Sequence, residues 1–160
     1  MILVTGATGF IGSHTSVELL CAQYSILGID NFINSNDEVL SKIQQITNKS
    51  MPFVEGDICD LAKLRSLFAN HSIDAVIHFA ALKAVGDSVA NPNVYYQNNL
   101  TGLINLLTVM KEFDCRFLIF SSSATVYDPE NEPPFLEGMS ENPINPYGRT
   151  KLFSEKIIKD

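Results

Sequence analysis

The sequence has few cysteines, few basic residues and no long apolar run. Its three cysteines, Cys21, Cys59 and Cys115, lie far apart and form no C-x-x-C pair, so we expect reduced thiols, no disulfide framework and no metal site. Lysine and arginine number 11 against 18 aspartates and glutamates, and the basic residues are scattered. We therefore expect neither nucleic acid nor an anionic membrane as a partner.

No stretch has the length of a membrane span, and Met1 leads directly into a short apolar run without the basic start of a secretion signal. Internal repeats and low-complexity linkers are also missing. The 46% apolar and 18% charged residues are those of an ordinary globular protein, and 160 residues are enough for one full domain. We expect a cytoplasmic protein in which residues 1–160 form a single domain.

Short apolar runs alternate with amphipathic segments along the whole chain. The runs that predict strands are residues 2–4, 24–30, 52–57, 74–80 and 116–123. Helices are expected after the first glycines, after Asn36 and Asp37, from Asp60 as N-cap, from Pro92 as one long helix, and from Pro146. Continuous apolar strands between helices predict an α/β fold, a doubly wound parallel sheet of the Rossmann type, covered on both faces, in the order 3-2-1-4-5. Such a sheet ordinarily continues to a sixth strand, so we expect it to be incomplete on its C-terminal side.

The first strand ends in "TGATGFIG", which places Gly6, Gly9 and Gly12 between a strand and a helix. In a dinucleotide-binding turn the first glycine permits the tight turn, the second lets backbone approach a pyrophosphate, and the third allows close helix–strand packing. Free N–H groups at the helix start would face the phosphates. A plain glycine-rich turn is the alternative.

Acidic residues end the second and third predicted strands. Asp30 lies 24 positions after Gly6, near the spacing at which a carboxylate accepts hydrogen bonds from the adenosine ribose. A 2′-phosphate would be repelled there and no arginine follows directly, which favours NAD over NADP. Asp57 is placed to bind the adenine amino group. A turn-forming role is the alternative for Asp30.

Hydroxyl, phenol and amine groups gather in the last third of the sequence. Ser121, Ser122 and Ser123 follow the fifth strand, at the edge where ligands bind in such sheets; the alternative is that their hydroxyls merely close the strand. Tyr147 and Lys151 lie four residues apart on one predicted helix, so both can point to the same place. The ammonium would favour a tyrosinate, which could take a hydroxyl proton while hydride leaves the same carbon, with Ser123 steering the oxygen.

Seven motifs together resemble one enzyme family. These are "VTGATGFIGSH", "DNFINS", "FVEGDI", "VIHFAALKAVGDSV", "YYQNN", "FSSSATVY" and "NPYGRTK". They are similar to the UDP-glucose 4-epimerases of the extended short-chain dehydrogenase/reductase superfamily, which serve galactose metabolism. In that family bound NAD takes hydride from C4 of a UDP-hexose and returns it to the other face of the 4-keto sugar. The resemblance covers the whole chain, which would form the cofactor half, without the C-terminal lobe that holds the UDP.

The resemblance implies specific roles for residues of this chain. Tyr147, Lys151 and Ser123 would be catalytic, and Lys83, Ser123 and Tyr147 would meet the UDP-sugar. NAD would contact Gly6, Gly9, Phe10, Ile11, Gly12, Asp30, Asn31, Phe32, Ile33, Asn34, Ser35, Asp57, Ile58, Phe79, Ala80, Ala81, Leu82, Lys83, Asn98, Ser123, Tyr147 and Lys151. A homodimer through the helices from Pro92 and Pro146 is also implied, although their apolar faces could instead belong to the core of one subunit.

Departures from the family pattern leave other functions open. Ala81 and Asp128 stand where the family usually has glycine, and the chain is short for the whole enzyme. One alternative is another extended-family sugar-nucleotide enzyme, such as a dehydratase. It is weakened because Ala124 and Thr125 replace the acidic pair expected after the strand-five serine. The other alternative is an NAD-binding module without catalysis.

Overall fold

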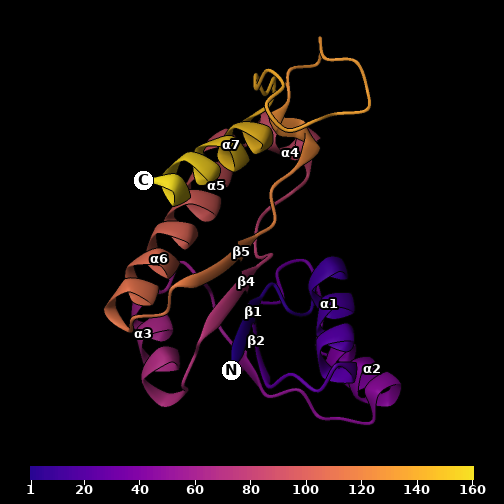
Figure 1. The fold of residues 1–160 in the computed structure, drawn as a ribbon, viewed down its shortest axis with the longest axis vertical. Coiled ribbons are helices and arrows are strands. Elements are labelled where there is room, and N and C mark those ends of the chain that lie inside the picture. Colours follow the sequence, from indigo (N-terminus) through magenta and orange to yellow (C-terminus); the bar gives the residue numbers. More distant parts are fainter. The chain divides into compact units, whose positions relative to one another are not determined.

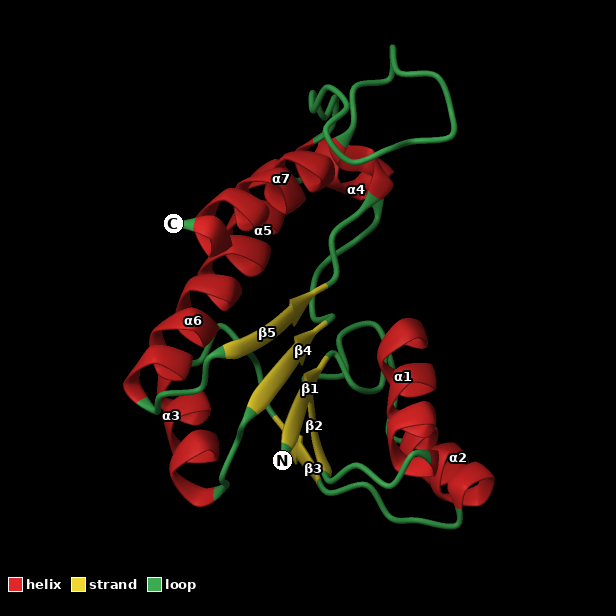
Figure 2. Ribbon diagram, in the orientation of Figure 1, coloured by secondary structure: helices red, strands yellow, loops and turns green.

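A five-stranded parallel sheet forms the centre of the N-terminal part of the chain. The computed structural model describes residues 1–160. The strands run in the order β3-β2-β1-β4-β5, which confirms the predicted order (Figure 2). β1 lies between its two neighbours, with Thr5 opposite both Ile29 and His78. The strand bounds are β1 (Ile2–Thr5), β2 (Ile26–Asp30), β3 (Phe53–Glu55), β4 (Ala75–His78) and β5 (Phe117–Phe120).

Helices occupy the segments between the strands and continue beyond β5 (Figure 1). Their bounds are α1 (Phe10–Cys21), α2 (Glu38–Thr47), α3 (Leu61–Asn70), α4 (Val85–Ala90), α5 (Pro92–Tyr96), the π-helical turn η1 (Gln97–Thr101), α6 (Gly102–Glu112), the 3₁₀ turn η2 (Ala124–Val126) and α7 (Pro146–Lys159). None of these helices combines the length and the apolar character that crossing a bilayer requires.

The residues form two compact units. Unit 1 comprises Met1–Ala80 and Asn105–Ser121, and contains the whole sheet with α1, α2, α3 and most of α6. Unit 2 comprises Ala81–Ile104 and Ser122–Asp160, and contains α4, α5, η1, η2 and α7.

Unit 1 has a core on each face of the sheet. Successive residues of β1 point to opposite faces, so Leu3 joins one core and Val4 the other, and both are fully buried. The Leu3 core includes Leu64 of α3 and Leu106 of α6, whereas the Val4 core includes Leu20 of α1. Each such side chain stabilises the fold by about 1.5–3 kcal/mol through burial. The cores fix the ends of β1, β2 and β4, where the predicted nucleotide residues lie.

The prediction that both faces of every strand are covered is wrong for β5. Phe117 and Ile119 are 73% and 64% exposed. β5 pairs with β4 on one side only and ends the sheet. Phe117 and Ile119 alternate with Leu118 along β5 and so point to the same face, whereas Leu118 points to the other face and packs against the Leu3 core.

Polar side chains accept N–H groups at the starts of three helices, and at α2 the expected Asn36 accepts the Glu38 N–H at 3.1 Å. The Asp60 carboxylate accepts the Lys63 N–H at 2.9 Å at the start of α3, as predicted. Asn145 caps α7 in the same way, accepting the Gly148 N–H at 2.8 Å. At α2 the Asp37 side chain makes no capping bond.

The long helix predicted from Pro92 is confirmed: α5, η1 and α6 follow one another without a break from Pro92 to Glu112, and the unpredicted feature is the five-residue π-helical turn η1 within it. α4 was not predicted at all. Tyr95 of α5 is 1% exposed and belongs to the interior of unit 2. Val94, Ile104 and Phe153 remain 42–52% exposed, so the apolar faces of these helices are only partly used within the chain. The homodimer stays a prediction.

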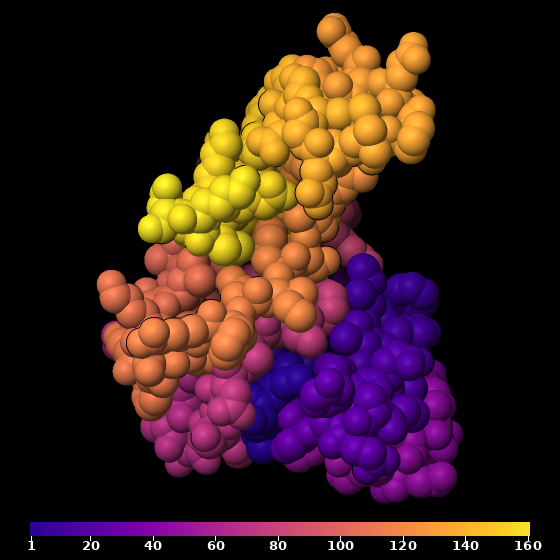
Figure 3. Space-filling view, viewed as in Figure 1, coloured from indigo at the N-terminus to yellow at the C-terminus, as the bar shows by residue number.

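An irregular segment joins η2 to α7, as the prolines predicted. Asp128 shapes it: its N–H donates to the Ser140 carbonyl, and its carboxylate accepts the Glu130 N–H, both at 2.9 Å. The rings of Tyr127 and Phe135 stack 5.1 Å apart. Figure 3 shows this light-orange segment at the surface of unit 2. Asp128 is thus accommodated in a turn that its own side chain stabilises.

Candidate active site

The glycines of the turn between β1 and α1 are of two kinds: two are required by packing within the protein, and one is not. Gly6 has φ of +66°, and a Cβ there would lie 2.7 Å from the Ala80 nitrogen. A Cβ on Gly12 would collide with the Gly6 carbonyl, so both glycines are required by packing of the protein itself. Gly9 has an ordinary φ of −69°, and a Cβ there would meet only the Gly6 oxygen, at 3.3 Å. Packing within the protein therefore requires glycine at positions 6 and 12 but not at position 9. A glycine that packing does not require is expected where a ligand approaches the backbone.

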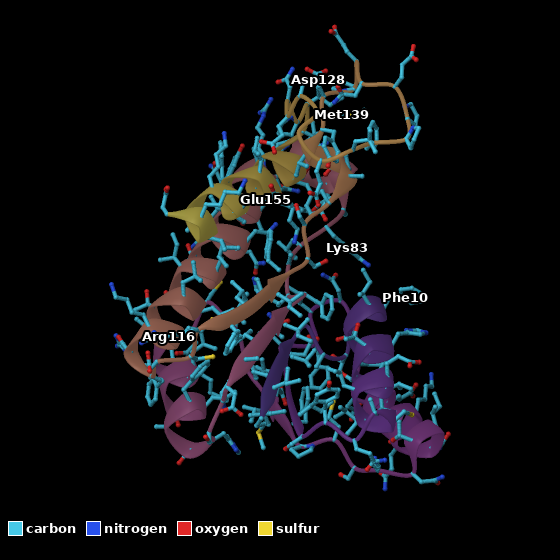
Figure 4. All side chains as sticks on the ribbon, in the orientation of Figure 1. Phe10, Lys83, Arg116, Asp128, Met139 and Glu155 are labelled. Atoms are coloured by element: carbon cyan, nitrogen blue, oxygen red, sulfur yellow. The ribbon has the colours of Figure 1, made fainter.

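The start of α1 directly follows Gly9 and has no side-chain cap. The first N–H groups of any helix lack intrahelical acceptors and carry the positive end of the helix dipole. Phe10 and Ile11 occupy this first turn with their side chains 73% and 53% exposed (Figure 4). The turn can thus receive an anionic group through backbone N–H groups.

Asp30 ends β2 as the centre of a small hydrogen-bond network. Its carboxylate accepts the Thr8 N–H at 3.1 Å, the Phe32 N–H at 3.0 Å and the Ser35 hydroxyl at 3.4 Å. The Thr8 and Ser35 hydroxyls lie 2.7 Å apart. These bonds fix the carboxylate and leave it acceptor capacity for a ligand, because a carboxylate offers about four lone-pair sites. The sequence interpretation missed Thr8, which lies inside the glycine motif but acts through Asp30.

The loop after β2 is also tied to the loop after β3. The Asn31 amide donates to the Asp57 carboxylate at 3.0 Å, and Asp57 also accepts the Cys59 N–H at 2.7 Å. Ile58 is buried, whereas Ile33 is 65% exposed. Asn31, itself a predicted NAD contact, therefore holds in place the carboxylate of Asp57, the predicted adenine-binding residue.

The end of β4 is fixed by two residues that the sequence did not single out. The Ala80 N–H donates to the Thr5 hydroxyl at 3.2 Å, and the same hydroxyl is 2.7 Å from Nδ1 of His78. Thr5 and His78 are both almost fully buried. This arrangement holds the Phe79–Ala80 backbone against the turn at Gly6.

In unit 2, Tyr147 and Lys151 lie one turn apart on α7, as predicted. The Lys151 ammonium is 6.0 Å from the centre of the Tyr147 ring. Lys151 is only 4% exposed, and burial lowers its pKa from 10.5 to about 8. At pH 7 a group with that pKa is still about 90% protonated, so the buried amine stays a cation.

Ser123 stands beside η2 in the same unit. Its hydroxyl accepts the Thr125 N–H at 3.2 Å and lies 2.9 Å from the Thr125 hydroxyl. A Cβ on Gly148 would lie 2.6 Å from the Thr125 carbonyl, so Gly148 allows α7 to approach η2 closely. Gly148 therefore brings the segment of Ser123 next to that of Tyr147, and the sequence interpretation missed it.

Ser122, next to Ser123, is also hydrogen-bonded to α7. The Ser122 hydroxyl donates to the Glu155 carboxylate, one turn beyond Lys151. Together with the Gly148 contact, this bond ties the segment after β5 to α7 at two points.

The predicted site residues divide between the two units. Lys83 is exposed (Figure 4). Asn98 donates to its neighbour Asn99 at 3.0 Å. No group of three or more His, Cys, Asp or Glu residues is arranged to hold a metal ion. Unit 1 carries Gly6, Gly9, Phe10, Ile11, Gly12, Asp30, Asn31, Phe32, Ile33, Asn34, Ser35, Asp57, Ile58, Phe79 and Ala80, and unit 2 carries Ala81, Leu82, Lys83, Asn98, Ser123, Tyr147 and Lys151.

Curated relatives and solved structures resemble this chain over nearly its full length. It is 49% identical to the UDP-glucose 4-epimerase of Bacillus subtilis and 47% identical to that of Pisum sativum, in each case over 99% of the chain and 47% of the relative. The crystal structure of UDP-glucose 4-epimerase from Bifidobacterium longum in complex with NAD+ and UDP matches with a TM-score of 0.97 and 48% identity, over 99% of this chain and 48% of that one. The Stenotrophomonas maltophila enzyme, with bound NAD and formylated UDP-arabinopyranose, matches with a TM-score of 0.96 and 43% identity, over 99% and 47%.

These matches confirm the resemblance to UDP-glucose 4-epimerases and the Rossmann-like fold. The chain spans about half the length of the curated relatives it matches. A family model described as GDP-mannose 4,6 dehydratase matches residues 3–160. The chain therefore belongs to the family that this model describes, and within it the chain is similar to the N-terminal half of UDP-glucose 4-epimerases.

Proposed function

We propose that the chain is the cofactor-binding and acid/base half of an NAD-dependent enzyme that inverts C4 of a UDP-hexose, interconverting UDP-glucose and UDP-galactose. The observation that carries the proposal is that Ser123, Tyr147 and a buried Lys151 lie in one compact unit, with the Lys151 amine 6.0 Å from the centre of the Tyr147 ring. The 43–49% identity to epimerases along the chain supports it.

The residues of unit 1 fit NAD. Gly9 has no side chain to block its backbone, although packing within the protein does not require glycine there. The first turn of α1 offers N–H groups for a pyrophosphate. Asp30, fixed by Thr8 and Phe32, accepts the ribose hydroxyls and repels a 2′-phosphate. Asp57, fixed by Asn31, accepts the adenine amino group. Bound NAD would supply a reversible hydride acceptor.

Tyr147 is the proposed acid/base. Its phenolate takes the proton of the sugar 4-hydroxyl during oxidation and returns it after the 4-keto sugar has turned over. The Lys151 ammonium, 6.0 Å from the centre of the Tyr147 ring, favours the phenolate because a nearby positive charge stabilises the ionised form. The low exposure of Lys151 limits screening by water and salt.

Ser123 is the proposed partner for the 4-oxygen. Its hydroxyl is held between the N–H and the hydroxyl of Thr125, so it is oriented before substrate arrives. The exposed Lys83 is the proposed contact to the UDP-sugar.

A sugar-nucleotide dehydratase is the second candidate, since the matching family model carries that description. Dehydration needs an acid and a base that remove water from the neighbouring carbons of the 4-keto sugar. This chain has Ala124 and Thr125 after Ser123, and neither side chain is a carboxylate. The residues therefore favour epimerisation.

The test is to purify the protein, measure its NAD content, and assay UDP-galactose conversion beside Tyr147→Phe. The proposal expects bound NAD in both proteins and conversion in the wild type alone, because phenylalanine keeps the ring and removes only the proton-transferring oxygen. Bound NAD without conversion in the wild type would favour a binding module. Equal conversion in both proteins would contradict the role of Tyr147.

A further inference from the structure

A side chain of α6 holds the segment between β3 and α3, which carries two of the predicted NAD contacts, Asp57 and Ile58. The carboxamide nitrogen of Asn105 donates to the Ile58 carbonyl at 3.3 Å and to the Cys59 carbonyl at 2.9 Å. Asn105 follows these residues by 47 and 46 positions, and it is not among the predicted site residues. All of these residues belong to unit 1.

The orientation of this carboxamide follows from its partners. Both carbonyls can only accept, so the nitrogen of Asn105 and not its oxygen must face them. An amide nitrogen carries two hydrogens, which is one for each carbonyl. Asn105 is partly buried, and hydrogen bonds sheltered from water are electrostatically stronger than exposed ones. Both donors of the side chain are therefore used to hold this one segment.

The two carbonyls lie where regular secondary structure gives them no place. They stand between β3 and α3, ahead of the Asp60 cap, and so belong neither to the ladder of the sheet nor to the helix. Polar backbone groups in such a segment take their partners from side chains or water. Ile58 is 5% exposed and its side chain belongs to the Leu3 core. The core and Asn105 thus hold Ile58 by its side chain and by its carbonyl.

One peptide group links Asn105 to the Asp57 carboxylate. The Ile58 carbonyl and the Cys59 N–H belong to the same planar peptide unit. Its carbonyl end accepts from Asn105, and its N–H end donates to the Asp57 carboxylate at 2.7 Å. Because the unit is rigid, a rotation that breaks one of these bonds also disturbs the other. Asn105 therefore acts on the carboxylate through a single peptide group.

We propose that Asn105 is a positioning residue for the adenine end of NAD: it braces the Ile58–Cys59 peptide, whose N–H orients the Asp57 carboxylate toward the adenine amino group. This inference rests on the NAD binding of the proposed function. Asn31 holds the other carboxylate oxygen at 3.0 Å, so the carboxylate is oriented before the nucleotide arrives. A carboxylate held in this way accepts from an amino group and repels a carbonyl oxygen at the same place.

The first test compares NAD with nicotinamide hypoxanthine dinucleotide, in which a carbonyl oxygen replaces the adenine amino group. Asn105→Leu keeps the approximate size of the side chain and removes both donors. Asn70→Leu is the matched control, because the Asn70 amide also donates to a backbone carbonyl, that of Ser66 at 2.8 Å within α3. We expect calorimetric titrations to show a preference for NAD at least about fivefold lower in Asn105→Leu, and within about twofold of wild type in Asn70→Leu.

The ratio of the two affinities separates a positioning role from a general one. A general loss of structure weakens the binding of both dinucleotides alike, whereas a misplaced carboxylate weakens the contact that only NAD makes. A ratio that stays at its wild-type value in Asn105→Leu would therefore overturn the inference, even if both affinities fall. An equal loss of preference in Asn70→Leu would overturn it as well.

The second test needs no cofactor. Asn105→Leu releases the Ile58–Cys59 peptide, so hydrogen exchange of the Cys59 N–H should be at least about tenfold faster. The Phe113 N–H, which donates to the Val109 carbonyl at the end of α6, should change little and shows that the helix is intact. Unchanged exchange at Cys59, or the same acceleration at Phe113, would refute the brace.

The two tests also separate this inference from the proposed function. A wild type that binds neither dinucleotide would contradict the proposed NAD site and the adenine role of Asn105 with it, and faster exchange at Cys59 would then show a structural contact only. Bound NAD without conversion of UDP-galactose would contradict the proposed epimerisation, and the affinity ratio would still decide the role of Asn105.

Discussion

Alanine substitutions at Gly6 and Gly9 separate what folding requires from what the ligand requires. At Gly6, alanine must adopt φ of +66°, which costs about 1–2 kcal/mol, and its Cβ would lie 2.7 Å from the Ala80 nitrogen. Relieving that overlap in a packed core adds about 1–3 kcal/mol. We expect Gly6→Ala to lower the free energy of unfolding by about 2–5 kcal/mol.

At Gly9 the same methyl group meets only one atom, at 3.3 Å, from a backbone that alanine adopts readily. The loss of unfolded-state entropy favours alanine by about 0.4–1 kcal/mol, which roughly offsets the tight contact. We expect unfolding of Gly9→Ala within about 1 kcal/mol of wild type, and NAD affinity at least about tenfold weaker, because the methyl group would occupy the approach to the pyrophosphate.

Urea unfolding and calorimetric titration with NAD measure both quantities on the same samples. Gly9→Ala binding NAD as tightly as wild type would refute the assignment of Gly9 to the phosphates. Equal destabilisation of both variants would refute the packing argument.

Three further predictions concern other parts of the site. Lys151 has a pKa of about 8 in the folded state against 10.5 in the unfolded state, so the unfolded state binds more protons between these pH values. The free energy of unfolding should therefore rise by up to about 3 kcal/mol as the pH increases across that window, relative to Lys151→Met in paired urea titrations. Parallel curves for the two proteins would contradict the burial argument. Asp30→Ala should lower the preference for NAD over NADP at least about tenfold in binding titrations, and an unchanged ratio would remove Asp30 from the ribose site. Gly148→Ala places a Cβ 2.6 Å from the Thr125 carbonyl, which should cost about 1–3 kcal/mol in urea unfolding and lower kcat, whereas Arg149→Ala, at an exposed position of the same helix, should do neither.

The elements that follow from local pattern were predicted correctly. Strand order, the Asp60 cap and the helix beginning at Pro146 rest on short-range periodicity, capping chemistry and right-handed connections, which one sequence displays. The pairing of Tyr147 with Lys151 follows from helical spacing in the same way.

The parts that were missed depend on contacts between distant segments. The Thr8 N–H donates to Asp30, 22 positions later, and the buried Asn99 amide donates to the Thr150 hydroxyl, 51 positions later. Nothing in the neighbourhood of either residue indicates its partner. The exposed face of β5 was missed for a related reason, since an apolar run reads the same at the edge of a sheet as at its centre.

Hydride leaving and returning to C4 is the central claim, and an isotope label tests it most directly. UDP-galactose carrying deuterium at C4 would be converted by the protein in ordinary water, and the product would be examined by mass spectrometry and NMR. We expect UDP-glucose with deuterium retained at C4, because the same hydride is returned to the other face of the sugar. Loss of the label to water would indicate removal of the C4 hydrogen as a proton and would contradict hydride transfer.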